Sequence, residues 1–257
     1  MTPEELRDLF DMRGRVVLVT GGTRGIGRAI AGGFAAAGAR VVVASRKPEA
    51  CEQAAKEIID GGGEAIGLPT HMGDIDAVRR LVAITAGEFG GIDIVVNNAA
   101  NALTMPTEQI TEEAWDKSYA VNLKGPVFLC AAALPHLSES SHAAVVNILS
   151  VGAITYAPNN AMYSGAKAAL FAFTRNLAAE WADRGIRVNA LAPGTVDTDM
   201  VRNTGREAVE RMRQISWQKR IARPDEMVGP ALFLASDAAS YVTGQLLIAD
   251  GGYAVAR

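Results

Sequence analysis

The sequence predicts an α/β fold in which one doubly wound domain holds a parallel sheet with helices on both faces. Two observations lead to this prediction. Short apolar runs rich in β-branched residues alternate with segments of helical length along almost the whole chain, and such alternation is typical of parallel strands joined by crossover helices. No linker, internal repeat or low-complexity segment divides the sequence, so we expect a single domain over residues 1–257.

Each expected strand is a short apolar run bounded by polar or turn-forming residues. These runs cover residues 16–20, 40–44, 64–68, 92–97, 144–149, 187–191 and 245–249. The helices between them begin and end at recognisable signals. The first helix covers about 26–37 and is stopped by Gly38. The second begins at Pro48 and ends at the glycines 61–63. The third is capped by Asp74 or Asp76.

The second half of the chain continues the alternation. A fourth helix is expected over 111–137, bent or distorted at Gly125 and Pro126. A fifth covers 161–183, and Pro224 opens a sixth with acidic residues at the favourable end of its dipole. The stretch 193–216 looks irregular and is too long for a simple connection. We therefore interpret residues 193–220 as a substrate loop or lid, the alternative being a surface insertion with no role.

A glycine-rich turn, Gly21-Gly-Thr-Arg-Gly25-Ile-Gly27, joins the first strand to the first helix. Gly21 permits a sharp turn, Gly25 lets the backbone approach a pyrophosphate, and Gly27 lets the helix pack close to the strand. The unpaired N–H groups at the helix start would face the phosphates. The pattern predicts a dinucleotide site, and the alternative is a turn that merely needs flexible residues.

The end of the second strand indicates which dinucleotide is preferred. Ser45, Arg46 and Lys47 stand where an NAD site usually places an acidic residue against the ribose hydroxyls. Arginine suits a phosphate because its planar fork can bond two oxygens. We therefore predict NADP(H), with Arg24 and Arg46 on the 2′-phosphate. NAD(H) remains the alternative, with these side chains as ordinary solvated charges.

Tyr163 and Lys167 lie four residues apart and so share one face of the fifth expected helix. A phenol has a pKa of roughly 10, and a nearby lysine cation should lower that pKa toward working pH. Such a pair can exchange a proton with an alcohol or carbonyl oxygen, although a surface pair is the alternative. Ser150 follows the fifth strand and could bond the same oxygen. Asn122 would either tie backbone segments together or hold a water near the lysine.

Composition argues against several other classes of protein. With 25 basic and 28 acidic residues, the net charge is −3, and the basic footprint of a nucleic-acid binder is missing. The N-terminus lacks a signal-peptide pattern, and no uninterrupted apolar run looks long enough to span a bilayer. The two cysteines and three histidines are not spaced as a disulfide framework or a metal site. We expect a cytoplasmic protein with no metal and no membrane or nucleic-acid partner.

Together these residues resemble the short-chain dehydrogenase/reductase family, in its short single-domain type. The resemblance is carried, in chain order, by Thr20, Gly21, Gly25, Gly27, Asn97-Asn-Ala-Ala100, Asn122, Ser150, Tyr163, Lys167, Pro193 and Gly194. It implies a Rossmann domain with a seven-stranded parallel sheet, in which Asn97 stabilises the sheet. It also implies a tetrad of Asn122, Ser150, Tyr163 and Lys167. In the family the tyrosine is the acid/base, the serine steadies the substrate oxygen, the lysine lowers the tyrosine pKa and bonds the nicotinamide ribose, and the asparagine supports a proton relay.

The resemblance also implies cofactor contacts along most of the chain. These would be Gly21, Thr23, Arg24, Gly25, Ile26, Gly27, Ser45, Arg46, Lys47, His71, Asn98, Ala99, Tyr163, Lys167, Pro193, Gly194, Val196 and Thr198. Two positions depart from the family. Ala100 replaces a frequent glycine, and Thr70-His71-Met72 stands where the family often has an aspartate that contacts adenine. We expect the methyl group to be tolerated and His71 to stack on or bond the adenine edge.

The expected activity is hydride transfer between nicotinamide and a carbonyl or secondary alcohol, on the CH–OH group of donors, with Tyr163 as acid/base. One alternative is a 3-oxoacyl thioester (acyl carrier protein) reductase, whose carrier phosphate would meet the loop arginines Arg202, Arg206, Arg211 and Arg213; these otherwise form a solvated helical face. A second is a non-catalytic dinucleotide-binding redox sensor. A nucleotide-sugar epimerase or dehydratase is disfavoured, because such relatives have another glycine spacing and a separate substrate domain.

The expected substrate pocket is mostly apolar, which suits an aliphatic, aromatic or cyclic ketone, or a β-ketoacyl thioester, better than a sugar acid. Its expected residues are Ala102, Leu103, Val151, Ala153, Ile154, Tyr156, Met162, Met200 and Trp217. The resemblance also implies a homotetramer or homodimer in which the fourth and fifth helices pack across a twofold axis. Small residues of the fifth helix, Ala168, Ala169 and Ala172, would allow the close approach.

Overall fold

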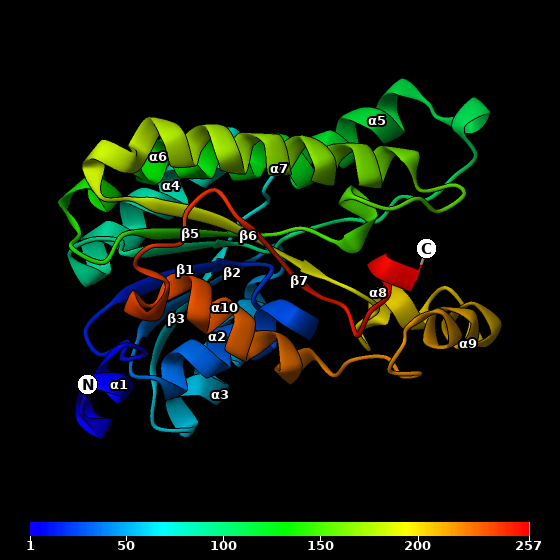
Figure 1. The fold of residues 1–257 in the computed structure, drawn as a ribbon. Coiled ribbons are helices and arrows are strands. Elements are labelled where there is room, and N and C mark those ends of the chain that lie inside the picture. The colour runs from blue at the N-terminus through cyan, green and yellow to red at the C-terminus, as the bar shows by residue number, and fades with distance from the viewer. Residues whose placement is uncertain (257) are drawn as a thin grey trace.

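The computed structural model describes residues 1–256 and contains a seven-stranded sheet in which every pairing is parallel (Figure 1). The strands are β1 (Val16–Thr20), β2 (Arg40–Ser45), β3 (Glu64–Pro69), β4 (Ile94–Asn97), β5 (Ala144–Ile148), β6 (Arg187–Pro193) and β7 (Leu246–Ala249). Their order in the sheet is β3-β2-β1-β4-β5-β6-β7, so the direction of winding reverses between β1 and β4. The predicted fold class and all seven strands are confirmed, with ends that shift by at most two residues.

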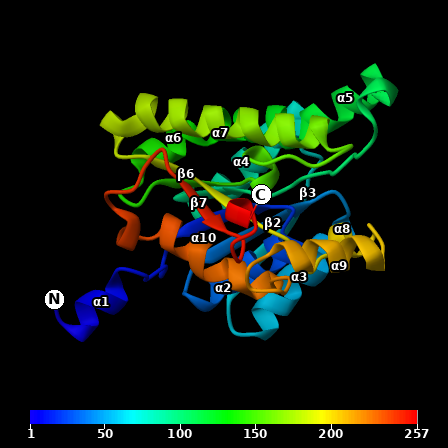
Figure 2. The same cartoon turned by 45° about the vertical axis from the view of Figure 1, so that its right-hand side comes forward.

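Helices cover both faces of the sheet, and Figures 1 and 2 show them as two separate layers. One layer holds α4 (Ile75–Phe89), α5 (Glu112–Tyr119), α6 (Gly125–Glu139) and α7 (Ala161–Trp181), and the other holds α2 (Gly25–Ala36), α3 (Pro48–Asp60) and α10 (Val228–Ala235). The remaining α-helices are α1 (Pro3–Asp8) near the N-terminus and α8 (Asp199–Arg202) and α9 (Arg206–Ile215) after β6. Short turns complete the chain: a π-helical turn η2 (Ala120–Lys124) and 3-10 turns η1 (Thr107–Gln109), η3 (Val151–Ala153), η4 (Ala182–Arg184), η5 (Pro224–Met227), η6 (Asp237–Ala239) and η7 (Ala254–Ala256).

The apolar runs of the sequence form strands because both faces of the sheet are covered. Every residue of β1, β4 and β5 is buried, as expected for central strands of a parallel sheet. Ile30 and Phe34 of α2 pack on one face, and Leu129 and Leu137 of α6 pack on the other. Full burial of one such side chain contributes about 1.5–3 kcal/mol, so the two cores fix the helices relative to the strand ends.

Local end signals in the sequence match the observed helix boundaries. The Asp74 carboxylate accepts hydrogen bonds from the N–H groups of Asp76 and Ala77, both at 3.0 Å, and so caps α4. Thr111 caps α5 through a 3.1 Å bond from the Ala114 N–H group. Gly38 adopts a φ of +96° just after α2, a conformation that favours glycine. Capping and turn chemistry within one turn of the chain therefore account for these ends.

The prediction of an irregular stretch over 193–216 is wrong, because α8 and α9 form within it. No residue of α9 is fully buried, although Ala208, Val209, Met212 and Ile215 lie half-buried along one face, and ion pairs within the helix support it. Glu210 lies 3.3 Å from Arg213, and Glu207 lies 3.9 Å from Arg211, at the i,i+3 and i,i+4 spacings that support an isolated helix. The segment is thus a pair of surface helices beyond the carboxyl edge of the sheet (Figure 1).

The expected fourth helix is present, and its distortion is the π-helical turn η2 between α5 and α6. Gly125 has to be glycine because a Cβ there would overlap the Met72 carbonyl oxygen. By length and composition alone, the combined helix Glu112–Glu139 could cross a membrane, because it contains an 18-residue window with a mean hydropathy of 1.2. Its apolar residues Leu129 and Leu137 are instead fully buried against the sheet, as in a core helix.

Candidate active site

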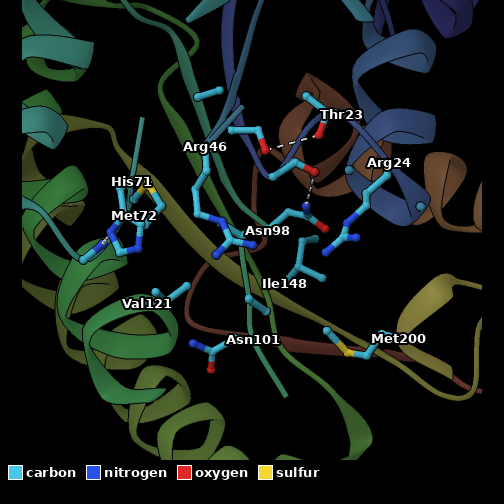
Figure 3. A pocket seen from close by; sticks show the side chains of 18 of the residues that line it. Thr23, Arg24, Arg46, His71, Met72, Asn98, Asn101, Val121, Ile148 and Met200 are labelled. Atoms are coloured by element: carbon cyan, nitrogen blue, oxygen red, sulfur yellow. Dashed lines mark hydrogen bonds between the residues drawn. The ribbon is translucent and has the colours of Figure 1, made fainter. Parts of the chain in front are cut away.

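A cavity of about 850 Å³ opens where the strand order reverses, at the carboxyl ends of β1, β4 and β5. This is the usual ligand site of open α/β sheets. Figure 3 shows side chains from widely separated parts of the chain around it. Those labelled are Thr23, Arg24, Arg46, His71, Met72, Asn98, Asn101, Val121, Ile148 and Met200.

The ends of β1 and β4 are joined by a compact set of hydrogen bonds at the base of the cavity. The Thr20 hydroxyl accepts from the N–H groups of Asn98 and Ala99, both at 3.1 Å, and the Asn98 amide donates to the Thr20 carbonyl at 2.8 Å. A Cβ on Gly27 would overlap the Asn98 side-chain amide and the Gly21 carbonyl oxygen. Only glycine at this position therefore lets the start of α2 reach the strand ends.

The glycine-rich turn forms a cradle that fits a pyrophosphate. Gly21 and Gly25 adopt positive φ values of +65° and +53°, as the predicted turn requires. The intrahelical bonding of α2 begins where the Arg28 N–H group donates to the Arg24 carbonyl, so the three preceding N–H groups have no acceptor within the helix. The residues that carry them, Gly25, Ile26 and Gly27, all line the cavity. Exposed backbone donors at a helix N-terminus are suited to bind an anion.

The polar end of β2 fits the 2′-phosphate of an NADP(H) ribose. Arg46 extends into the cavity in Figure 3, and the Thr23 hydroxyl donates to the Ser45 hydroxyl at 3.2 Å. Arg24 also lines the cavity, and its guanidinium lies 3.8 Å from the Asp199 carboxylate of α8. Lys47 precedes α3 as its N-cap and is not among the cavity-lining residues. Of the three basic side chains, the structure thus brings Arg24 and Arg46 to the cavity.

Tyr163 and Lys167 face the same cavity from the first turns of α7. Ser150 caps the turn η3 by accepting from the Gly152 N–H group at 3.1 Å, and its hydroxyl is hydrogen-bonded to the Tyr163 phenol. The Lys167 ammonium donates to the Ile148 carbonyl at 2.8 Å and lies 5.7 Å from the centre of the Tyr163 ring. The fold therefore assembles Ser150, Tyr163 and Lys167 at the end of β5.

The expected fall of the Tyr163 pKa toward working pH is wrong in this structure, because burial dominates the shift. Burial raises the pKa of Tyr163 to about 12, and the hydrogen bond from Ser150 lowers it only in part. Burial also lowers the pKa of Lys167 to about 8. The physical reason is that both groups are desolvated, which disfavours each charged form, while the lysine ammonium directs a bond to the Ile148 carbonyl.

Asn122 joins backbone segments, which is one of its two expected roles. It is fully buried within η2, accepts from the Asn101 N–H group at 3.1 Å, and donates to the Asn101 carbonyl at 2.8 Å and side chain at 2.9 Å. Asn101 lines the cavity, so Asn122 positions the chain that follows β4. Single π-turns inside α-helices are frequent at functional sites.

Several other predicted residues have different environments. Pro193 ends β6, and the Gly194 N–H group donates to the Ala249 carbonyl of β7. Val196 is buried and pairs with Ala222. Of residues 193–198, only Thr198 lines the cavity. Of the nine predicted pocket residues, Leu103 and Met200 line the cavity, and Met162 is buried elsewhere in α7. Ala100 lines the cavity without disturbing it. The sequence did not predict that Asn101 would bond Asn122 or that the Ile148 carbonyl would accept from Lys167, because each bond joins segments far apart in the chain.

These features define a Rossmann-type domain with a dinucleotide crevice and a Ser-Tyr-Lys cluster, and comparison with known proteins agrees. The family model described as enoyl-(acyl carrier protein) reductase matches residues 21–254. The probable galactose dehydrogenase GalD of Rhizobium meliloti is 36% identical over 94% of this chain and 96% of its own. A 3-oxoacyl-[acyl-carrier-protein] reductase of Synechocystis is 39% identical over 93% and 96%, respectively.

Solved structures show the same similarity. The gluconate 5-dehydrogenase of Burkholderia cenocepacia, in complex with NADP and tartrate, superposes with a TM-score of 0.93 at 32% identity and covers 97% of this chain and 99% of its own. The chain belongs to the short-chain dehydrogenase/reductase family. It is an oxidoreductase of the group that acts on CH–OH donors.

Proposed function

We propose that the protein is an NADP(H)-dependent oxidoreductase that interconverts a ketone and a secondary alcohol, with Tyr163 as its acid/base. The observation that carries the proposal is the shared cavity. It joins the glycine-rich cradle and Arg46 at one end to Tyr163 and Lys167 at the other. A single dinucleotide bound across the reversal point would connect these two ends.

The nicotinamide supplies the hydride for reduction and accepts it in the reverse direction. The residues of this chain manage the proton and the oxygen. As a carbon–hydrogen bond forms at the carbonyl carbon, the C=O π bond breaks and the Tyr163 phenol gives its proton to the carbonyl oxygen. The product keeps the C–O single bond and gains C–H and O–H bonds, and Tyr163 is left as the phenolate. The Ser150 hydroxyl holds that oxygen where charge develops. Lys167, buried beside the tyrosine ring, supplies positive charge that favours the phenolate left behind.

The preference for NADP(H) follows from the side chains at the end of β2. Arg46 extends into the cavity, and no acidic residue occupies positions 45–47 to bond a free 2′-hydroxyl (Figure 3). A guanidinium can bond two phosphate oxygens at once. The related gluconate 5-dehydrogenase contains NADP, which supports the assignment.

A ketone with an apolar frame fits the substrate end of the cavity best. Leu103 and Met200 line the same cavity as Tyr163. A 3-oxoacyl thioester is the second candidate, favoured by the Synechocystis relative. The loop arginines favour it less, since Arg202 bonds both oxygens of Asp197, at 2.7 and 3.0 Å, and Arg213 lies beside Glu210. These pairs reduce the free positive charge that a carrier phosphate would meet.

Replacing the phenol tests the chemistry directly. We expect Tyr163→Phe to lower the rate of carbonyl reduction by about 10²- to 10⁴-fold. The rate is followed by NADPH absorbance at 340 nm with a panel of ketones and thioesters. The NADP+ affinity of the variant should stay near that of the wild type. Tyr241→Phe, at a fully exposed tyrosine, is the control and should be unaffected. Cofactor binding without turnover of any substrate, in the wild type as in the variant, would favour a redox sensor.

A second substitution tests the cofactor preference. We expect Arg46→Ala to weaken NADP+ binding by about 10- to 100-fold, because a charged hydrogen-bonded pair with the phosphate is lost, and to change NAD+ binding little. Lys47→Ala removes the same charge from the adjacent position outside the cavity and should leave both affinities unchanged. Equal losses for NADP+ and NAD+ in Arg46→Ala would contradict the assignment; calorimetric titration measures both.

A further inference from the structure

His71 lies on the cavity wall next to the expected adenine position. The pyrophosphate cradle is at the end of β1 and the 2′-phosphate side chains are at the end of β2, so the base of the dinucleotide extends toward β3. His71 follows β3 directly and lines the cavity together with Met72 and Arg46 (Figure 3). Its ring is solvent-exposed in the cavity, whereas Met72 is buried in the core.

The hydrogen bonding of His71 fixes its tautomer. Ring atom Nδ1 accepts a hydrogen bond from the Gly73 N–H group at 3.1 Å. In a neutral imidazole one nitrogen accepts and the other donates, so the proton resides on Nε2. A Cβ at Gly73 would lie 2.9 Å from Cε1 and 3.1 Å from Nδ1 of His71. The Nδ1–Cε1 edge of the ring thus lies against Gly73, and its Nε2–H group is not engaged by the Gly73 N–H group.

The neighbouring carboxylate does not replace the missing aspartate. Asp74 also lines the cavity, but one of its oxygens accepts from the N–H groups of Asp76 and Ala77, both at 3.0 Å. Its other oxygen lies 3.9 Å from the Arg80 guanidinium. Asp74 is therefore turned toward the start of α4, and the ring donor of His71 is the side chain presented to the base.

We propose that His71 binds the purine of the cofactor as a hydrogen-bond donor, so that the protein does not select for the 6-amino group of adenine. A carboxylate accepts a bond from that amino group, but a ring N–H group cannot. It can donate to a ring nitrogen of adenine, and it can equally donate to the 6-oxo oxygen of hypoxanthine. This inference rests on the proposed dinucleotide site. It predicts that base selectivity is relaxed where the family aspartate would enforce it.

Equilibrium binding tests the proposal without turnover. NADP+ and nicotinamide hypoxanthine dinucleotide phosphate would be titrated calorimetrically into the wild type, His71→Asp, and the control His136→Asp, which makes the same charge change on α6 outside the cavity. We expect the wild type and the control to bind the two nucleotides within about threefold. His71→Asp should prefer NADP+ by about tenfold or more, which corresponds to about 1.4 kcal/mol.

A wild-type preference for NADP+ above about threefold, or an unchanged ratio in His71→Asp, would overturn the proposal. Failure of the wild type to bind either nucleotide would instead contradict the proposed function, so the two failures are distinguishable. A second measurement needs no nucleotide. Two-bond ¹H–¹⁵N NMR correlations should show His71 with its proton on Nε2, and a proton on Nδ1 would refute the donor geometry.

Discussion

Lys167 shows how burial changes the behaviour of a single residue. Only 1% of it is exposed, and burial lowers its pKa to about 8. Its charge is therefore present at pH 7 and is lost as the pH rises through about 8. Tyr163, whose pKa is raised to about 12, stays protonated throughout this range. Lys167 thus has the electrostatic role, and Tyr163 has the proton-donating role.

This separation predicts the pH dependence of carbonyl reduction. We expect kcat/KM to fall above about pH 8 as the Lys167 cation is lost, because the phenolate then forms without a neighbouring positive charge. Lys167→Arg should keep its charge at higher pH and remove this alkaline fall, although its activity at pH 7 would be lower because the larger head group disturbs the site. A wild-type profile that stays level to pH 10 would contradict the prediction.

At the same scale, the sequence allowed the side chains of the site to be predicted but not their bonding. The i,i+4 spacing placed Tyr163 and Lys167 on one face of a helix, and Ser150 followed a recognisable strand. The bond from Lys167 to the Ile148 carbonyl could not be foreseen, because it depends on how α7 crosses the end of β5. The resulting desolvation reversed the expected direction of the Tyr163 pKa shift.

Among the elements, the start of α2 depends on one glycine more than on any other residue. We expect Gly27→Ala to abolish NADP+ binding and to destabilise the fold by about 1–3 kcal/mol, because the added methyl group would overlap the Gly21 carbonyl and Asn98 and force the helix away from β1. Gly32→Ala is the matched control in the same helix, where the nearest atom is the flexible end of Arg28, at 3.3 Å. It should be neutral or stabilising by up to about 1 kcal/mol. Urea unfolding and nucleotide titration measure both; equal behaviour of the two variants would contradict the packing argument.

Elements with strong local signals were predicted well, and those with conflicting signals were not. Capping residues such as Asp74 and Thr111 act within one turn, so the starts of α4 and α5 can be predicted from the sequence. α9 escaped prediction although Ala208, Val209, Met212 and Ile215 follow helical spacing, because this short stripe stands among charged residues in a segment interpreted as a loop. The π-turn η2 was anticipated only as a distortion, since Gly125 is required by contact with distant Met72.

Across the whole molecule, a buried polar chain connects the centre of the sheet to the helix that carries Tyr163. The Asn97 amide of β4 donates to Asn147 of β5 at 2.8 Å, and Asn147 donates to the Thr174 hydroxyl of α7 at 2.9 Å. Asn97 was expected, from the family resemblance, to stabilise the sheet, and its bond to Asn147 links the neighbouring strands β4 and β5. Buried polar groups that lose a partner are costly, so the chain holds the two layers in register.

Breaking that chain should destabilise the whole domain. We expect Thr174→Val to lower the free energy of unfolding by about 1–3 kcal/mol, because the buried Asn147 amide loses its acceptor. Thr85→Val is the control: Thr85 is equally buried, but its hydroxyl donates to the Leu81 carbonyl of its own helix, at 2.7 Å, so its loss leaves no distant amide unpaired. Urea unfolding should show a smaller effect for Thr85→Val, and similar losses in both variants would count against the network.

The sequence by itself determined the alternation of strands and helices, the glycine-rich cradle, the basic end of β2 and the Tyr-Lys face, because each depends on local periodicity, turn chemistry or spacing. The tertiary structure decided which of these residues share a cavity. It brought Arg46 and His71 to the cavity and left Lys47 outside, and it buried Lys167 against the Ile148 carbonyl. Such outcomes depend on contacts between segments far apart in the chain. Side chains such as Lys167 lose their water only when these contacts form, and the steric limits on residues such as Gly27 arise from the same contacts.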